Sequence, residues 1–225
     1  MSDSGAEPDD TPRSGLPAAV GRALTDPKGR ALIVGLIAMV PLLWAMTAPR
    51  VPDNPPPPVL LRVPDFELID QDGRPRGSDQ LRSGPWVAAV FFTRCPTVCP
   101  RLIEDLRSVE VDTRVGAPDG RFVCFSADPS HDQPEVLRAY QAERGLEGER
   151  WVLLTGEEAQ VRSTLLEGLK LGLGEDGEAP FGIFHATSLA LVDRDLNVRG
   201  YYRSDDRAEM DQLAQDLITL DRLSH

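Results

Sequence analysis

The chain has 225 residues, enough for one core of ordinary size, and its 36 acidic and 24 basic side chains give a formal net charge of −12. This balance excludes a nucleic-acid-binding protein, because the sequence has no basic stripe that could neutralise phosphates. Three cysteines are too few for a disulfide scaffold.

The first predicted element is a membrane-spanning helix over residues 31–48, a segment without a charged side chain. About 18 to 20 apolar residues suffice to cross a bilayer. Basic residues precede this segment and Arg50 stands nearly alone after it, so the positive-inside rule predicts a disordered cytoplasmic N-terminus over 1–30. The protein would cross the cell (inner) membrane once, and the rest of the chain would be periplasmic or otherwise extracytoplasmic. A cleaved signal peptide is the alternative, but its apolar core would be shorter and nearer the start.

A proline-rich tether follows the predicted anchor, over residues 49–58. Four consecutive prolines occupy positions 55–58. Such a run favours an extended polyproline spacer, which would hold the domain at 59–225 away from the membrane surface.

Strand patterns recur through this domain. Residues 66–69 and a strand around Pro75 flank the turn residues Asp72-Gly73, which predicts a β-hairpin. The continuous apolar run at 86–92 predicts a central strand buried on both faces. The same reasoning predicts strands at 121–127, 151–154, 188–192 and 198–202, the last two joined as a hairpin.

Helical patterns lie between the strands. The first helix should start near Cys99, with Pro100 in its first turn. A second should be capped by Asp132 and end at Gly145. Apolar stripes at 161–169 and 210–220 predict two more. Because helices alternate with strands and a cysteine pair follows a central strand, the fold class is predicted to be α/β, a thioredoxin-like sandwich with a central mixed sheet flanked by helices.

The candidate functional groups are two thiols and one imidazole. Cys95 and Cys99 stand four residues apart in the segment CPTVCP, and His185 lies far along the chain. Two thiolates and an imidazole suit a soft or borderline metal, with copper the leading candidate. The same two thiols could instead cycle with a disulfide. A helix N-terminus favours anions, so we expect the thiol of Cys99 to be acidified.

Other sites fit these residues less well. Haem attachment would require a histidine directly after Cys99, and structural zinc would require a fourth protein ligand that is not evident. Cys124 lies in an apolar run and is expected to be a small buried hydrophobic residue. His131 could be an auxiliary ligand, but a solvated loop histidine is the favoured interpretation.

The sequence resembles the Sco/SenC family of copper-binding, membrane-anchored, thioredoxin-like proteins over roughly residues 63–223. The resemblance rests on FFTRCPTVCP at 91–100, on SADP at 126–129 followed by PEVL at 134–137, and on His185 with the strand after it. The chain departs from the family pattern at His131, where arginine is usual, and at Gln133, where threonine is usual.

The resemblance implies a ligand set and a function. Cys95, Cys99 and His185 would hold one copper ion per chain, and Asp128 would either orient a ligand or serve as an ordinary turn residue. The protein would be a copper metallochaperone for assembly of the copper centre of cytochrome c oxidase. Its partners would be the copper-site subunit of the oxidase and a copper donor or thiol reductant protein.

A thiol–disulfide reductase is the alternative function. The pair Cys95 and Cys99 would then act on cysteines of the oxidase subunit or of another exported protein. His185 discriminates between the two hypotheses, because thiol exchange does not need an imidazole ligand there. A peroxiredoxin-like peroxidase fits poorly, since it would need an isolated nucleophilic cysteine.

Overall fold

The computed structural model describes residues 27–28, 39, 55–172 and 187–224. The chain divides into two units, Met1–Arg50 and Val51–His225, and the elements that follow belong to the second. The predicted cytoplasmic N-terminus and membrane anchor fall almost wholly outside the described residues, and His185 also lies outside them. Within the described ranges, no helix is both long enough and apolar enough to cross a membrane.

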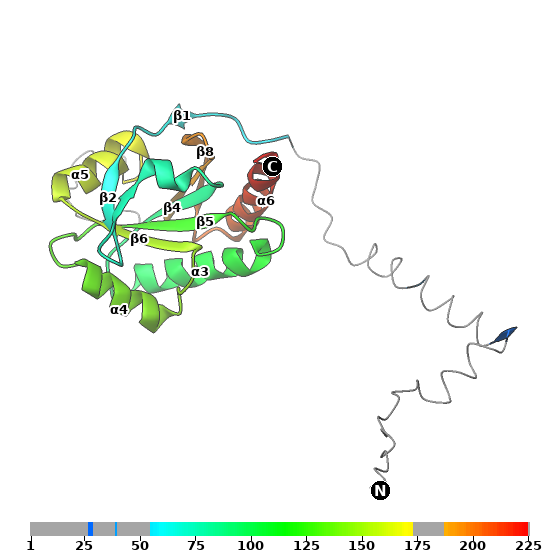
Figure 1. Cartoon of the computed structure of the whole chain (residues 1–225), viewed down its shortest axis with the longest axis horizontal. Coiled ribbons are helices and arrows are strands. Elements are labelled where there is room, and N and C mark those ends of the chain that lie inside the picture. The colour runs from blue at the N-terminus through cyan, green and yellow to red at the C-terminus, as the bar shows by residue number, and fades with distance from the viewer. Residues whose placement is uncertain (1–26, 29–38, 40–54, 173–186, 225) are drawn as a thin grey trace, which may run out of the picture. The chain divides into compact units, whose positions relative to one another are not determined.

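One mixed sheet organises the domain (Figure 1). In the described part of the chain it has eight strands in the order β1-β8-β7-β4-β5-β6-β2-β3. The three strands β4, β5 and β6 run parallel, and every other neighbouring pair is antiparallel. The strands are β1 (Leu61–Arg62), β2 (Glu67–Asp70), β3 (Pro75–Gly77), β4 (Trp86–Phe91), β5 (Arg121–Ser126), β6 (Trp151–Thr155), β7 (Ser188–Val192) and β8 (Asn197–Arg203).

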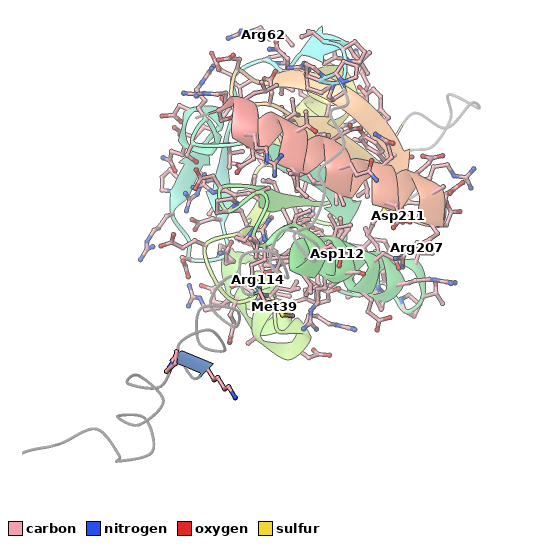
Figure 2. The ribbon with its side chains drawn as sticks, turned by 90° about the vertical axis from the view of Figure 1, so that its right-hand side faces the viewer. Met39, Arg62, Asp112, Arg114, Arg207 and Asp211 are labelled. Carbon is pink, nitrogen blue, oxygen red and sulfur yellow. The ribbon has the colours of Figure 1, made fainter. Side chains whose placement is uncertain are left out.

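Helices cover both faces of this sheet, so the domain has two apolar cores. On one face lie α3 (Val98–Thr113), α4 (Pro134–Arg144) and α6 (Arg207–Leu223), with α6 packed beside α3 (Figure 2). The other face carries α5 (Glu158–Ser163) and the π-helical turn η2 (Thr164–Gly168), and the 3₁₀ turn η1 (Ser78–Leu81) contributes Leu81 to the same core. This layered arrangement confirms the predicted α/β sandwich.

Strand β4 forms from the continuous apolar run at 86–92 and is covered by helices on both faces. All six of its side chains are buried, because alternate residues of a strand point to opposite faces and both faces are covered. Val87, Ala89 and Phe91 belong to the core under α3 and α6. Trp86, Ala88 and Val90 belong to the core on the other face.

Most local predictions are confirmed. The β2–β3 hairpin forms with Gly73 at φ 74°, and α4 stops at Gly145, whose φ of 63° is a left-handed conformation that favours glycine. The predicted cap of α4 is wrong. Gln133, not Asp132, occupies the N-cap position, and it makes no side-chain capping bond. Asp132 is turned toward the loop that precedes α3 instead.

The last residues of the proline-rich stretch contact the domain. The carbonyl oxygen of Pro57 accepts bonds from the guanidinium of Arg199 on β8, at 2.8 Å from Nε and 2.5 Å from Nη2. The amide of Leu60 donates to the carbonyl of Val198. The chain therefore enters the domain along β8, at the edge of the sheet where β1 lies.

Candidate metal centre

The two motif cysteines lie where the central strand turns into a helix. We call residues 92–97, between the end of β4 and the start of α3, the cysteine loop. Cys95 lies within it and its amide donates to the carbonyl of Phe92 at 3.2 Å. Cys99 is the second residue of α3, and Pro100 follows in the first turn, where its missing N–H leaves no bond unmade, as predicted.

The sulfur of Cys95 takes the place of a helix cap. Thr97 is the N-cap residue of α3, but its side chain accepts no capping bond. Instead, the amide of Cys99 donates to Sγ of Cys95 at 3.3 Å. The exposed N–H groups of a helix start thus point at the thiol of the loop residue, where negative charge is stabilised.

This environment lowers the pKa of Cys95. Partial burial is the largest single influence and acts to raise the pKa. Hydrogen bonds from the amides of Cys99, Thr97 and Val98, together with the Cys99 thiol, outweigh it. Cys95 is also partly exposed, so it is the reactive and accessible member of the pair.

The expectation of an acidified Cys99 is wrong. Burial raises the pKa of Cys99 to about 12, and the neighbouring Cys95 adds to the rise. The Cys99 side chain is 0 % exposed and packs into the core under α3. Its position in the first helical turn does not help, because the side chain points into apolar surroundings and the helix amide is directed at Cys95.

Cys124 behaves as the small buried hydrophobic residue that the sequence predicted. It lies on β5 with no exposed surface, and burial raises its pKa to about 12. The three cysteines are free thiols.

Asp132 holds the cysteine loop, a role that the sequence did not indicate. Its carboxylate is 0 % exposed. It accepts bonds from the amide and hydroxyl of Thr93, at 3.1 and 2.5 Å, and from the hydroxyl of Ser126 at 2.6 Å. Thr93 and Asp132 are 39 positions apart in the chain, so no local pattern could reveal the contact.

Asp128 lies beside the loop through a different residue. Its carboxylate forms an ion pair with Arg94, the residue before Cys95, and accepts a bond from the hydroxyl of Ser130. Burial acts to raise the pKa of Asp128, but the bonds from Arg94 and Ser130 and the charges of Arg94 and His131 lower it overall. His131 itself is half-buried in the turn that starts at Asp128.

Within the described ranges, no group of three or more histidine, cysteine, aspartate or glutamate side chains is arranged to hold a metal ion. Of the predicted ligands, the structure brings Cys95 and Cys99 together. The third, His185, falls in the stretch 173–186, outside the described residues.

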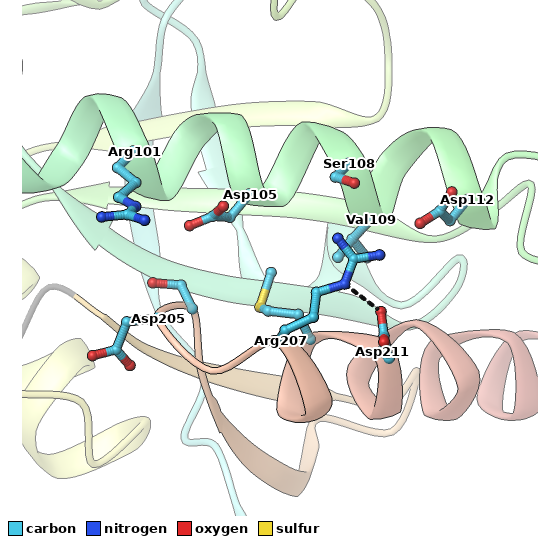
Figure 3. A pocket seen from close by; sticks show the side chains of 10 residues that line it. Arg101, Asp105, Ser108, Val109, Asp112, Asp205, Arg207 and Asp211 are labelled. Carbon is cyan, nitrogen blue, oxygen red and sulfur yellow. Dashed lines mark hydrogen bonds and ion pairs between the residues drawn. The ribbon is translucent and has the colours of Figure 1, made fainter.

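A separate pocket of about 230 Å³ lies between α3 and the start of α6 (Figure 3). Asp105 and Asp112 face it from α3, and Arg207 and Asp211, which pair at 3.0 Å, face it from α6. Neither a cysteine nor a histidine is among its lining residues, so it offers none of the soft ligands of the cysteine loop.

Three relatives show what the chain is similar to. The SCO1 protein homolog of Bacillus subtilis is 26% identical over 189 residues, covering 84% of this chain and 94% of the relative. A putative copper-binding protein of Stutzerimonas stutzeri is 31% identical over 150 residues, covering 63% and 69%. The solved structure of BsSco, a Sco-family cytochrome c oxidase assembly protein with a disulfide switch, is 25% identical, with a TM-score of 0.63 and coverages of 74% and 96%.

The family model described as SCO1/SenC matches residues 58–220, which is nearly the whole of the folded domain. The match includes the cysteine loop, the turn with Asp128 and Asp132 that contacts it, and the β7–β8 hairpin. Sequence, fold and site agree, and the chain belongs to the SCO1/SenC family.

Proposed function

We propose that this protein is a membrane-anchored copper metallochaperone. It binds one copper ion through Cys95, Cys99 and His185 and assists assembly of the copper centre of cytochrome c oxidase. Two relatives support this proposal by what their names state: one is a putative copper-binding protein, and BsSco is a cytochrome c oxidase assembly protein.

The observation that carries the proposal is the pairing of two free thiols at one helix start. The sulfur of Cys95 lies at 3.3 Å from the amide of Cys99, and the Cys99 thiol hydrogen-bonds to that sulfur. Two thiolates that converge from a loop and a first helical turn suit a soft ion such as Cu(I). Copper binding displaces the protons, so the high pKa of Cys99 makes loading dependent on pH.

The strand register supports His185 as the third ligand. β7 pairs antiparallel with β4, with Ala89 opposite Leu189. The start of β7 therefore lies at the end of β4, where the cysteine loop begins. His185 precedes β7 by three positions in the sequence, and three residues span at most about 11 Å of extended chain.

The redox state of Cys95 and Cys99 would control copper binding. Only the reduced dithiol can bind copper, and a disulfide between Cys95 and Cys99 would release it. An open three-ligand site also permits transfer, because an acceptor thiol can enter before a ligand leaves. Such an exchange leaves both thiols reduced, whereas a pair that an oxidant has converted to the disulfide would need two electrons from a thiol reductant protein before it could bind copper again.

A thiol–disulfide reductase is a second candidate, and the asymmetry of the two thiols favours it. Cys95 is accessible and has a lowered pKa, so its thiolate can attack a substrate disulfide and form a mixed disulfide. Cys99 then attacks Cys95, which releases the reduced substrate and leaves a Cys95–Cys99 disulfide. An external thiol reductant returns the two electrons.

A copper titration of the full-length reduced protein tests the proposed ligands. Wild type should bind one copper per chain, and Cys95→Ala or Cys99→Ala should abolish tight binding. Cys124→Ala is the matched control, because it removes a buried thiol from the same core. If Cys124→Ala damaged binding as much as Cys99→Ala in a folded protein, the ligand assignment would be wrong.

A further inference from the structure

The cysteine loop is fastened to the domain by one buried carboxylate. Both oxygens of Asp132 are used: Oδ2 accepts from the Thr93 amide and the Ser126 hydroxyl, and Oδ1 accepts from the Thr93 hydroxyl. Thr93 is two residues before Cys95, and Ser126 ends β5, the parallel neighbour of β4. The carboxylate thus ties the loop both to the sheet and to the turn before α4.

Within the described residues, an amide and two hydroxyls donate hydrogen bonds to the side chain of Asp132, and none of these donors is a basic side chain. A buried carboxylate without a hydrogen-bonded cation is costly, and it persists where its hydrogen bonds fix a geometry. The ion pair of Arg94 with Asp128 is different, since Arg94 is 61% exposed and can move without leaving a buried group unpaired. Asp132 is therefore the stronger of the two attachments.

We propose that Asp132 is a positioning residue: by holding Thr93 it fixes the cysteine loop so that the Cys95 sulfur stays over the first turn of α3, facing Cys99. The expected effect of Asp132 on copper affinity rests on the proposed function, whereas its effect on the position of the loop does not. Groups that orient metal ligands typically affect metal affinity by about 10- to 100-fold, although they do not touch the metal.

Three substitutions separate positioning from general stability. Asp132→Ala removes all three bonds. Asp132→Asn keeps an oxygen for the Thr93 amide and the Ser126 hydroxyl, and its NH₂ group can donate to the Thr93 hydroxyl, which rotates to accept. Asp70→Ala is the matched control: Asp70 is also 0 % exposed and accepts three bonds at 2.9 Å, but it lies on β2, separated from β4 by two strands.

The experiment measures copper affinity by chelator competition and amide hydrogen exchange over residues 93–99, both on the full-length reduced protein. Asp132→Ala should lose about 10- to 100-fold in affinity and exchange faster in this segment. Asp132→Asn should restore both properties to near wild type, and Asp70→Ala should leave both unchanged even though it lowers stability.

The proposal is overturned if Asp132→Ala matches wild type in both measurements, if Asp132→Asn is as damaged as Asp132→Ala, or if Asp70→Ala is equally damaged. Should Asp132→Ala fail to fold, Thr93→Val replaces it, because it removes one donor and leaves the carboxylate in place. It should shift both measurements in the same direction, and no shift would overturn the proposal. A wild-type protein that binds no copper would refute the proposed function, while the exchange rates would still decide the role of Asp132.

Discussion

Two cysteines four positions apart differ chemically because one belongs to the loop and the other to the helix. Cys95 receives the amide bonds of the helix start, and Cys99 points into the apolar core. The pKa of the first is therefore lowered, and the pKa of the second is raised to about 12. This asymmetry suits both proposed functions, since copper loading and thiol exchange would each begin at the accessible sulfur.

The rates at which the three cysteines are alkylated should follow their exposure and their pKa values. At neutral pH iodoacetamide should modify Cys95 first, while Cys99 and Cys124 should react only when the domain unfolds, because both are 0 % exposed. The Cys95 rate should begin to rise at a lower pH than that of an unperturbed cysteine, since its thiolate persists to lower pH. Peptide mapping by mass spectrometry gives the order directly, and early modification of Cys99 would contradict the assigned environments.

Local patterns in the sequence predicted where Cys95 and Cys99 lie in the fold but not all of their environments. The central strand, the helix start at Cys99 and the burial of Cys124 follow from local patterns. The acidity of Cys99 was predicted wrongly, because the helix-start argument does not say which way a side chain points. The position of Asp132 just before Pro134 predicts a helix cap, whereas its contact with Thr93, 39 positions away, cannot be found from a local pattern.

At the scale of elements, the β7–β8 hairpin carries a buried ion pair that also contacts the incoming chain. Asp193 and Arg199 pair at 2.8 Å with side chains only 9% and 15% exposed. Arg199 also donates to the carbonyl of Pro57. One guanidinium therefore connects the hairpin turn to the end of the proline-rich stretch.

Arg199→Ala should destabilise the domain by about 3 kcal/mol, the lower end of the range for breaking a buried pair, because Asp193 keeps its bonds from Asp195 and Asn197. The matched control Arg207→Ala removes an ion pair whose arginine is 79% exposed, and it should cost at most about 1 kcal/mol. Urea unfolding of both variants measures the difference. Equal losses would show that the hairpin pair contributes no more than a surface pair.

The loss of folding stability caused by Arg199→Ala should also depend on pH. Burial acts to raise the pKa of Asp193, but its bonds from Asn197, Arg199 and Asp195 lower it overall. A lowered pKa in the folded state gives stability that is present above the unfolded pKa of about 3.9 and is lost as the pH falls through the folded value. The difference between wild type and Arg199→Ala should therefore be full above about pH 5 and should shrink below about pH 4. A difference that grew in acid would contradict this sign.

At the scale of the whole molecule, the cysteine loop lies at the end of β4, a central strand of the mixed sheet, and α3 follows the loop. Both cores pack against β4, so the loop leaves a rigid element. Cys99 lies on a helix that packs into the core, and Cys95 lies on the loop that leaves this buried strand, so both are attached to packed elements, which suits a small ligand set.

The proposed topology can be tested independently of the metal. Because residues 31–48 carry no charge and follow a basic flank, a reporter fused after His225 should be active only outside the cytoplasm, and the full-length protein should stay in the membrane fraction. A control reporter fused before the segment should be active only in the cytoplasm. A soluble, shortened product beginning near Pro49 would show that the segment is a signal peptide.

The most direct test of the central claim is the level of assembled cytochrome c oxidase in cells whose only copy of this protein is His185→Ala. The variant should retain a reversible Cys95–Cys99 disulfide, because both sulfurs lie on one loop-to-helix segment. It should lose much of its copper affinity, since one of the three proposed ligands is gone, and oxidase assembly should fall accordingly. Normal oxidase assembly by a variant shown to be copper-free would contradict the chaperone function and favour the reductase.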